Sequence, residues 1–373
     1  MGSNNEAPHN DRVCGHCGRA ITDDNYHVFD EEILCENCYS SQTVSCACCG
    51  DVIWSDNNAG SDEVPLCGEC YDDYYTTCER CGRTLRREYA NFDGDYHYCD
   101  NCWDEMESAV IHDYNYKPNP IFYGGDNRFF GVELEIDCAG HYSENAEKLL
   151  AIGNADCERI YIKFDGSLDD GMEIVTPPMT LDYHRTEMPW QEICKKAIAM
   201  GYKSHKTSTC GLHIHVNLDT FGATREAQES AISRVLYFVE HHWNELLRFS
   251  RRTEKQMARW AARYGYKNNP KDILDHAKSS GNSRYTYVNI TNYSTIEFRM
   301  FRGTLKLNML IATLELVDKI CEYAIRHSDD DLAKISWSEF VIALDKESCA
   351  ELIDYLKQRR LYVNSPIDDE GDD

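Results

Sequence analysis

The sequence has no apolar stretch that approaches the roughly 20 residues needed to cross a bilayer. It has no hydrophobic signal segment near its start either. Basic residues are also few, since 38 Lys and Arg stand against 64 Asp and Glu and give a formal net charge of −26. An acidic surface repels a phosphate backbone instead of releasing its counterions. We therefore expect a cytoplasmic protein without a membrane or nucleic-acid partner.

Lysine is absent from residues 13–107, where 21 Asp and Glu and 5 Arg give a net charge of −16. Cysteine, by contrast, is abundant there and forms six CxxC pairs. The pairs form three successive units of two pairs each. Within a unit 17 residues separate the two pairs, and the unit recurs every 32 residues, so the region is a threefold repeat. The pairs are Cys14/Cys17, Cys35/Cys38, Cys46/Cys49, Cys67/Cys70, Cys78/Cys81 and Cys99/Cys102.

Cysteine pairs at this spacing are typical of tetrahedral Zn²⁺ sites, which stabilise domains too small for a sufficient core. We predict three structural Zn²⁺ ions, each held by four thiolates in self-contained units that resemble zinc-ribbon or LIM-like knuckles. A disulfide framework is the alternative, which a reducing cytosol disfavours. Cys48 lies inside one knuckle and could replace a ligand. The repeats either dock a protein partner or substrate, or are purely structural.

Composition divides the rest of the chain. Residues 1–12 and 366–373 are polar or acidic and are predicted to be disordered tails. Residues 108–127, which contain prolines and glycines, are predicted to link the repeats to a domain spanning residues 128–365. In this domain, residues 224–264, 305–327 and 338–361 have the apolar spacing of helices that pack on a sheet. For Arg248, Arg251 and Arg252 we favour a solvated helix face, and a position facing a bound nucleotide is the alternative.

Three segments of this domain alternate apolar and ionisable residues as strands do. Because successive side chains on a strand point to opposite faces, each segment presents one row of functional groups. The rows are Glu133, Glu135 and Asp137; His213, His215 and Asn217; and Glu297 with Arg299. A solvated sheet surface is the alternative for any one strand. Glu and His are poor strand residues, however, so three such rows favour a metal–phosphate site.

A fourth segment carries Lys163 and Asp165 into a turn at Gly166 and returns through Glu173. In chain order, the motifs ExE, KxDGSL followed by EIVTPP, CGLHIHVN and IEFRMFRGT resemble the amidoligase family, which is related to glutamine synthetase and the glutamate–cysteine ligases. The resemblance covers roughly residues 128–327. It implies an α+β carboxylate–amine ligase fold, with a curved antiparallel sheet and outer helices, preceded here by the small, zinc-stapled, β-rich repeats.

The resemblance also implies a site for ATP and Mg²⁺ or Mn²⁺. It assigns metal binding to Glu133, Glu135, Glu173, His213 and Glu297, nucleotide binding to Arg299, Arg302 and His215, and catalysis to Arg299, His215, Lys163 and Asp165. Strand alternation puts Arg302 on the face opposite Arg299 unless the strand bulges. Asp165 has an alternative role as a turn residue, because Asp-Gly-Ser is a common turn sequence.

The implied enzyme is an amidoligase, which joins a carboxylate to an amine as an amide or isopeptide bond. The carboxylate first takes the terminal phosphoryl group of ATP to become an acyl phosphate, a step that depends on positioning and on charge neutralisation. The sequence leaves open whether the substrate is an amino acid, a peptide or a protein. Two other functions stay open: a metal-dependent hydrolase, since HxH with glutamates can also hold Zn²⁺, and a non-catalytic adaptor with a degenerate ligase fold.

Overall fold

The computed structural model describes residues 12–22, 25–93, 95–107, 109–279 and 284–362. Apart from Arg12, the two tails predicted to be disordered lie outside the described residues. The chain divides into two compact units, Met1–Ser108 and Ala109–Asp373. Among the described helices, none combines the length and the hydrophobicity that a membrane span requires.

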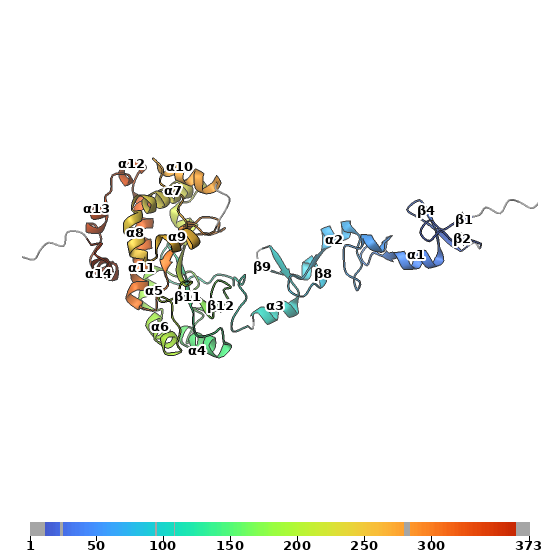
Figure 1. The fold of residues 1–373 in the computed structure, drawn as a ribbon, viewed down its shortest axis with the longest axis horizontal. Coiled ribbons are helices and arrows are strands. Elements are labelled where there is room, and N and C mark those ends of the chain that lie inside the picture. The colour runs from blue at the N-terminus through green and yellow to red at the C-terminus, as the bar shows by residue number, and fades with distance from the viewer. Residues whose placement is uncertain (1–11, 23–24, 94, 108, 280–283, 363–373) are drawn as a thin grey trace, which may run out of the picture. The chain divides into compact units, whose positions relative to one another are not determined.

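The amino-terminal unit consists of short antiparallel hairpins and short helices (Figure 1). Strands pair in the couples β1–β2, β3–β4, β5–β6, β7–β8 and β9–β10. The elements are β1 (Arg12–Val13), β2 (Ala20–Ile21), β3 (Tyr26–Phe29), β4 (Glu32–Cys35), α1 (Glu36–Gln42), β5 (Thr43–Ser45), β6 (Val52–Trp54), η1 (Ser55–Asn57), α2 (Gly68–Tyr74), β7 (Tyr75–Thr77), β8 (Thr84–Arg86), η2 (Arg87–Tyr89), β9 (Asn91–Asp93), β10 (Tyr96–Tyr98) and α3 (Asp100–Glu107).

Each repeat places its cysteines in the same local structures. The first CxxC pair lies in a hairpin turn, and the second spans the start of the helix, where Cys35 and Cys67 are the residues that precede α1 and α2. Gly18, Gly50 and Gly82 follow the hairpin pairs with φ values of 69°, 84° and 72°. Glycine adopts this left-handed conformation without the steric cost of a Cβ atom. The hairpin turn can therefore direct both cysteines toward the helix.

The repeats have very small hydrophobic cores, in which the cysteines are a major component. Leu34 packs with Cys14 and Cys38 in the first repeat, and Leu66 packs with Cys46 and Cys70 in the second. The third repeat has a similar core around its own cysteines. Cores of this size bury too little apolar surface to offset the entropy of ordering the chain.

The second unit contains a six-stranded sheet with the order β12-β13-β11-β14-β16-β15, in which all neighbouring strands are antiparallel. This confirms the predicted antiparallel sheet within a mixed α/β architecture. Val132, Leu134 and Ile136 on the central strand are fully buried in the main hydrophobic core. The strands are β11 (Phe130–Ile136), β12 (Tyr161–Lys163), β13 (Met172–Val175), β14 (Gly211–Asn217), β15 (Val288–Asn289) and β16 (Thr295–Arg302).

Apolar residues of the helices join Val132, Leu134 and Ile136 in the main hydrophobic core. Helix α7 contacts α8, α10 and α11, and α14 packs against α11. The predicted helical segment 224–264 is divided among α7, α8 and α9, and segment 338–361 between α13 and α14. The helices are α4 (Ser143–Gly153), α5 (Leu181–Thr186), α6 (Trp190–Ala199), η3 (Leu218–Phe221), α7 (Arg225–His241), α8 (Trp243–Ser250), α9 (Glu254–Trp260), α10 (Pro270–Ser279), α11 (Leu307–Arg326), α12 (Asp329–Leu332), α13 (Trp337–Ile342) and α14 (Ala350–Gln358).

Local capping explains several of these helix starts. The Thr224 side chain accepts a hydrogen bond from the backbone of Ala227 at the start of α7. Capping boxes open α9 at Thr253 and α13 at Ser336. Each cap satisfies backbone N–H groups that have no partner inside the helix.

The segment predicted to be a linker is bound to the sheet edge. The backbone N–H of His112 donates to the Ile162 carbonyl at 2.8 Å, and the Phe164 N–H donates to the His112 carbonyl at 2.9 Å. Further along, the Tyr123 N–H donates to the Pro178 carbonyl at 3.0 Å. An edge strand such as β12 offers unpaired backbone groups that favour this addition. Residues from Ala109 onward therefore belong to the second unit.

Candidate functional site

A cavity of about 60 Å³ lies over the polar face of the six-stranded sheet. We call it the acidic cavity because three glutamates contribute to its wall. The side chains that reach it from the strands are Glu133, Glu135, Lys163, Glu173, His213 and Arg299. All six come from positions predicted from the sequence, so the alternation of strand residues has brought them to one face.

Sheet register aligns these side chains in directly opposed pairs. Glu133 lies opposite His213, and Glu135 lies opposite Glu173. On the next strand, His215 lies opposite Glu297. Opposed side chains on one face have Cβ atoms about 5 Å apart, which is close enough for their functional groups to meet.

His213 is surrounded by carboxylates. Its Nδ1 atom is 3.4 Å from Glu133 Oε2 and 3.6 Å from Glu297 Oε1, and its Nε2 atom is 3.6 Å from Glu135 Oε1. His215 Nε2 is 3.2 Å from Glu133 Oε1. Both histidines therefore contact the same carboxylate, Glu133, from the neighbouring strand.

A glycine, which has no side chain, makes part of this arrangement possible. Gly211 begins β14, and a Cβ atom added there would lie 2.6 Å from His213 Nε2 and 2.8 Å from Arg252 Nη2. The Gly211 backbone N–H also donates a hydrogen bond to the Glu135 carboxylate. Glycine at this position therefore lets a histidine, an arginine and a glutamate approach one backbone segment.

Burial and charge shift the protonation of the cluster. Burial raises the pKa of Glu135, and burial together with the charge of Glu133 raises the pKa of Glu173 well above its usual value. Burial also opposes ionisation of Glu133, but the positive charge of His215 and a hydrogen bond from His213 prevail and hold the pKa of Glu133 well below its usual range. Burial lowers the pKa of His215, but Glu133 and Glu297 prevail and raise it. Protons that the cluster retains thus neutralise part of the negative charge of its carboxylates.

Two sets of ligand atoms in this cluster could each hold a metal ion. One comprises Glu133, His215 and Glu297, and the other comprises Glu133, Glu173 and His213. In each set the ligand atoms lie within 4.8 Å of one another. Glu133 belongs to both sets, and His215, which the sequence assigned to nucleotide binding, lies among the candidate ligands.

Cationic side chains face the glutamates. The Arg299 guanidinium donates a hydrogen bond to Glu297, and its Nε atom is buried without a hydrogen-bond partner among the described residues. Lys163 Nζ is 3.8 Å from Glu173 Oε2 and 5.2 Å from the ring centroid of Tyr114. Arg299 and Lys163 thus each lie beside one of the glutamates of this cluster.

Asp165 and Ser167 also line the acidic cavity. The Ser167 backbone N–H donates to Asp165 Oδ1 at 2.7 Å. This is the local hydrogen bond of an Asx-type turn. Asp165 therefore has the turn role that the sequence suggests and is also exposed to the cavity.

Arg302 is not part of the cavity wall. A bulge between Leu212 and Ile214 in the pairing of β14 with β16 places Arg302 opposite Gly211. This is the exception to regular alternation that the sequence left open, and it brings Arg302 to the face of Arg299. The side chain nevertheless turns away, and its Nη2 atom donates to the Thr207 carbonyl at 3.1 Å. Its prediction as a nucleotide ligand has no support from this position.

Asp137 also differs from the row predicted for its strand. Its carboxylate accepts hydrogen bonds from the backbone N–H groups of Cys138, Asp169 and Asp170, at 2.8, 3.2 and 2.7 Å. The Thr209 hydroxyl donates to it at 2.9 Å. Asp137 therefore holds loops together at the end of β11 and does not line the cavity.

Sequence reasoning missed several residues of the cavity wall, all outside the strands. The solvated position that we favoured for Arg252 is wrong: this residue is 6% exposed, lines the cavity and donates to the Phe301 carbonyl at 3.3 Å. Burial lowers the pKa of Arg252 to about 10. Tyr114, Trp260, Arg284 and Tyr285 complete the aromatic and cationic part of the wall. Strand periodicity carries no signal for them, since they come from turns, a helix end and the segment predicted to be a linker.

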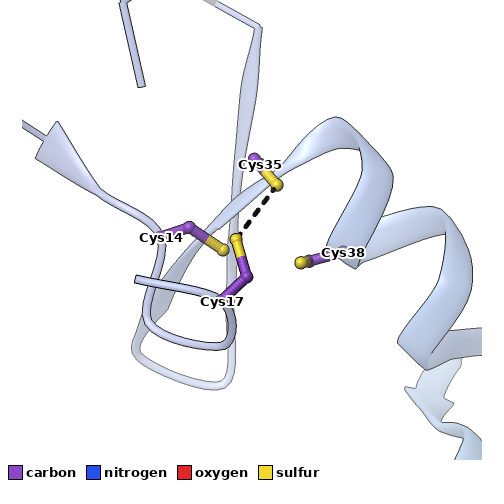
Figure 2. Close-up of side chains that lie close together, drawn as sticks. All are labelled: Cys14, Cys17, Cys35 and Cys38. Atoms are coloured by element: carbon purple, nitrogen blue, oxygen red, sulfur yellow. Dashed lines mark hydrogen bonds between the residues drawn. The ribbon is translucent and has the colours of Figure 1, made fainter. Parts of the chain in front are cut away.

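The cysteines of the amino-terminal unit form three tetrads, one in each repeat. In Figure 2 the sulfur atoms of Cys14, Cys17, Cys35 and Cys38 are directed toward a common centre. Cys17 Sγ is 3.9 Å from Cys35 Sγ, and hydrogen bonds from the backbone of Cys17 and Cys35 lower the pKa of Cys14 to about 6. Each tetrad combines two consecutive pairs, and its cysteines are free thiols. The tetrads could therefore bind three Zn²⁺ ions in self-contained units, without cross-bracing.

The second tetrad comprises Cys46, Cys49, Cys67 and Cys70 and does not include Cys48. Cys48 is half-buried beside this tetrad and packs against its small core. The four predicted ligands of this repeat thus lie together, and the replacement of one of them by Cys48 stays open.

Residues 153–321 match the model of a family described as "putative amidoligase enzyme". The resemblance to amidoligases is confirmed. The matched segment contains Glu173, His213 and Arg299 of the cavity and also Glu297, which contacts His213. Glu133 and Glu135 precede the matched segment. No curated protein matches the chain. The family match supports a ligase activity for the second unit.

Proposed function

We propose that the second unit is an ATP-dependent carboxylate–amine ligase with the carboxylate–amine ligase fold. It would form an amide or isopeptide bond through an acyl phosphate. The observation that carries the proposal is the alignment of Glu133 with His213 and of Glu135 with Glu173 across neighbouring strands, next to Arg299. We place the reaction in the cytoplasm, where the thiolates of the repeats stay reduced.

The donor set fits Mg²⁺ or Mn²⁺. Carboxylate oxygens suit both ions, and imidazole nitrogens shift the preference toward Mn²⁺. Burial raises the pKa values of Glu135 and Glu173 although His213 and Lys163 lie beside them, so nearby cations offset the burial of these carboxylates only in part. Glu133, which belongs to both of these candidate ligand sets, would help to hold a metal ion in either set. When bound, the ions would neutralise charge on the phosphate oxygens during phosphoryl transfer.

The chain itself supplies the remaining positive charge. Arg299, Arg252 and Lys163 line the same cavity as the carboxylates. Guanidinium groups bind phosphate oxygens through paired N–H donors and stay charged in a buried site. Lys163 is held between Glu173 and the ring of Tyr114, so its ammonium group is positioned before a ligand arrives. We assign these three side chains to phosphate binding and positioning.

A volume of about 60 Å³ has room for ions and water but not for a whole nucleotide. ATP must therefore displace side chains over the cavity. Arg284 donates hydrogen bonds to the hydroxyl groups of Tyr114 and Tyr285 and stacks over both rings. Exchange of these weak partners for phosphate oxygens would open the cavity and strengthen the hydrogen bonds of Arg284.

The repeats would serve the ligase as a docking module for a protein partner or a macromolecular substrate. Their charge of −16 over residues 13–107 favours a basic partner. The substrate of the ligase is an amino acid, a peptide or a protein. The zinc ions would be structural, because each tetrad supplies four thiolates and leaves no open coordination position.

The test is formation of ADP and of a condensation product from a lysate incubated with ATP, Mg²⁺ and the full chain, followed by mass spectrometry. Glu133→Gln keeps the side-chain volume but removes the charge shared by both ligand sets, and we expect a loss of activity on the order of 10²-fold or more. Glu144→Gln on the exposed surface of α4, where its partner is Lys148, should leave activity unchanged. Amide cleavage without ATP would indicate a metal hydrolase instead of a ligase. Absence of any turnover would indicate a non-catalytic adaptor.

A further inference from the structure

A second, larger pocket lies beside the acidic cavity in the second unit. It has a volume of about 570 Å³, which is within the range of pockets that bind small organic molecules. Its wall comes from the end of α6, the loop before β14, the turn after α8, the loop after β16, the start of α11, and the end of α14. We call it the basic pocket.

The charge of the basic pocket is opposite to that of the whole chain. Its wall carries five cations, Lys203, Lys206, Arg251, Lys306 and Arg359, and contains neither Asp nor Glu. The chain as a whole has 64 acidic residues and a net charge of −26. A concentration of positive charge without acidic neighbours is therefore a local feature, which attracts anions.

These cations have no carboxylate partners in the described part of the chain. Arg359 donates to the Arg248 carbonyl at 2.7 Å, and the structure gives none of the five an ion pair with Asp or Glu. Arg302 likewise donates to carbonyl groups, those of Arg251 and Thr207. Burial and then the charges of Arg251, Arg302, Lys306 and Lys206 lower the pKa of His205 to about 4. The positive field of the pocket is therefore not compensated by the protein itself.

The pocket also has an apolar side. Ile198, Leu305, Met309 and Tyr355 contribute to its wall, and Ile198 is 55% exposed. Inorganic ions would leave this apolar surface in water. An organic anion would cover the apolar surface while its charged group meets the lysines and arginines.

We propose that the basic pocket binds a small organic anion, with an apolar body and a phosphate or carboxylate group. Phosphate and carboxylate share the chemistry that Arg and Lys recognise. A concave pocket of about 570 Å³ has the size of a small-molecule site, whereas an acidic protein surface needs a broad interface. This site is separate from the proposed ligase site, and its binding test does not depend on ligase activity.

A shared turn connects the basic pocket with the acidic cavity. Arg251 lines the pocket and the next residue, Arg252, lines the cavity. Arg251 has a φ of 61°, in the left-handed region that is unfavourable for a residue with a Cβ atom. The turn is thereby held in a conformation that sends two successive guanidinium groups to two different sites.

The experiment measures binding of 1-naphthyl phosphate, 1-naphthoate and neutral 1-naphthol to the zinc-loaded full chain by isothermal titration calorimetry. We expect one or both anions to bind at least tenfold more tightly than naphthol, and the preferred anion identifies the charged group. The double variant Lys206→Glu/Lys306→Glu should bind that anion at least tenfold more weakly. Both lysines are exposed and absent from the acidic cavity, so this loss would localise the site.

Two control variants complete the design. Lys346→Glu changes the net charge by the same kind of substitution outside the pocket, and Glu133→Gln disables the proposed ligase site; both should keep the affinity within twofold. Failure of both anions to bind, equal affinity for naphthol, or unchanged binding by the double variant would overturn the proposal. An equal loss in Lys346→Glu would also overturn it, because the effect would then be due to net charge.

Discussion

The two units of this chain both gather metal-ligand side chains at one point, but they relate these side chains to the core in opposite ways. In the repeats, Cys14 and Cys38 pack directly with Leu34 and are part of the core. In the second unit, Glu133 and His213 lie on the polar face of a sheet whose other face is fully buried. A metal in the repeats would therefore support folding, whereas a metal in the second unit would support chemistry.

This comparison predicts opposite responses to metal removal, and the largest effect is on the repeats. A zinc chelator should unfold them, because binding of structural Zn²⁺ contributes about 10 to 16 kcal/mol in small zinc domains. The second unit should keep its thermal transition, since its core contains no predicted metal ligand. Circular dichroism and thiol titration would follow the two units.

Thiol titration also distinguishes zinc from disulfides. We expect the twelve CxxC cysteines to become reactive after chelation. Reactivity that appears only after a reductant is added would show disulfides instead. Cooperative loss of both units on chelation would contradict the division of roles between them.

A second, smaller effect is expected from the cationic side of the acidic cavity. Arg299→Ala should lower the rate of ADP formation by about 10² to 10³-fold, because a buried, preorganised charge is lost. Arg302→Ala provides a matched control three residues along the same strand, where the guanidinium binds carbonyl groups outside the cavity. In this variant the rate of ADP formation should fall less than tenfold. Equal losses in the two variants would contradict the distinction that the structure makes between them.

The smallest effect concerns pH. The raised pKa values of His215 and Glu173 mean that these ligands hold protons that a metal must displace. Affinity for Mn²⁺ should therefore rise as pH increases through these pKa values, and the gain should level off above them. Stability of the metal-free unit changes in the other direction, because the contribution of protonated His215 is present at low pH and is lost as pH rises through its raised pKa.

Calorimetric titration of Mn²⁺ in buffers of different ionisation enthalpy would detect the released protons. His215→Asn should reduce the proton release. If binding released no protons at any pH, the metal would have to lie elsewhere in the chain.

Regular spacing explains which parts of the molecule can be predicted from the sequence. The CxxC pairs form one tetrad in each repeat, because two consecutive pairs lie on a short hairpin and an adjacent helix. Glu133, Glu135, His213 and Arg299 also face one cavity, because a period of two is built into every strand. In both cases a local backbone geometry converts sequence spacing directly into spatial direction.

Residues that reach the cavity from irregular segments could not be predicted in this way. Tyr114 belongs to a segment that resembles a linker in composition but is hydrogen-bonded along the sheet edge. Arg252 follows a left-handed residue at the end of a helix, so helical periodicity no longer determines its direction. The bulge between β14 and β16 likewise changes the face on which Arg302 lies.

Local chemistry alone thus specified the cysteine tetrads, the polar and apolar faces of the strands, and the family that residues 153–321 match. The folded chain decided the rest: which loops close over the carboxylates, which arginine turns inward, and that lysines and arginines far apart in the sequence form a basic pocket. The reason is that strand alternation and CxxC spacing act over a few residues. Contacts between distant loops depend instead on how the whole sheet and its helices pack.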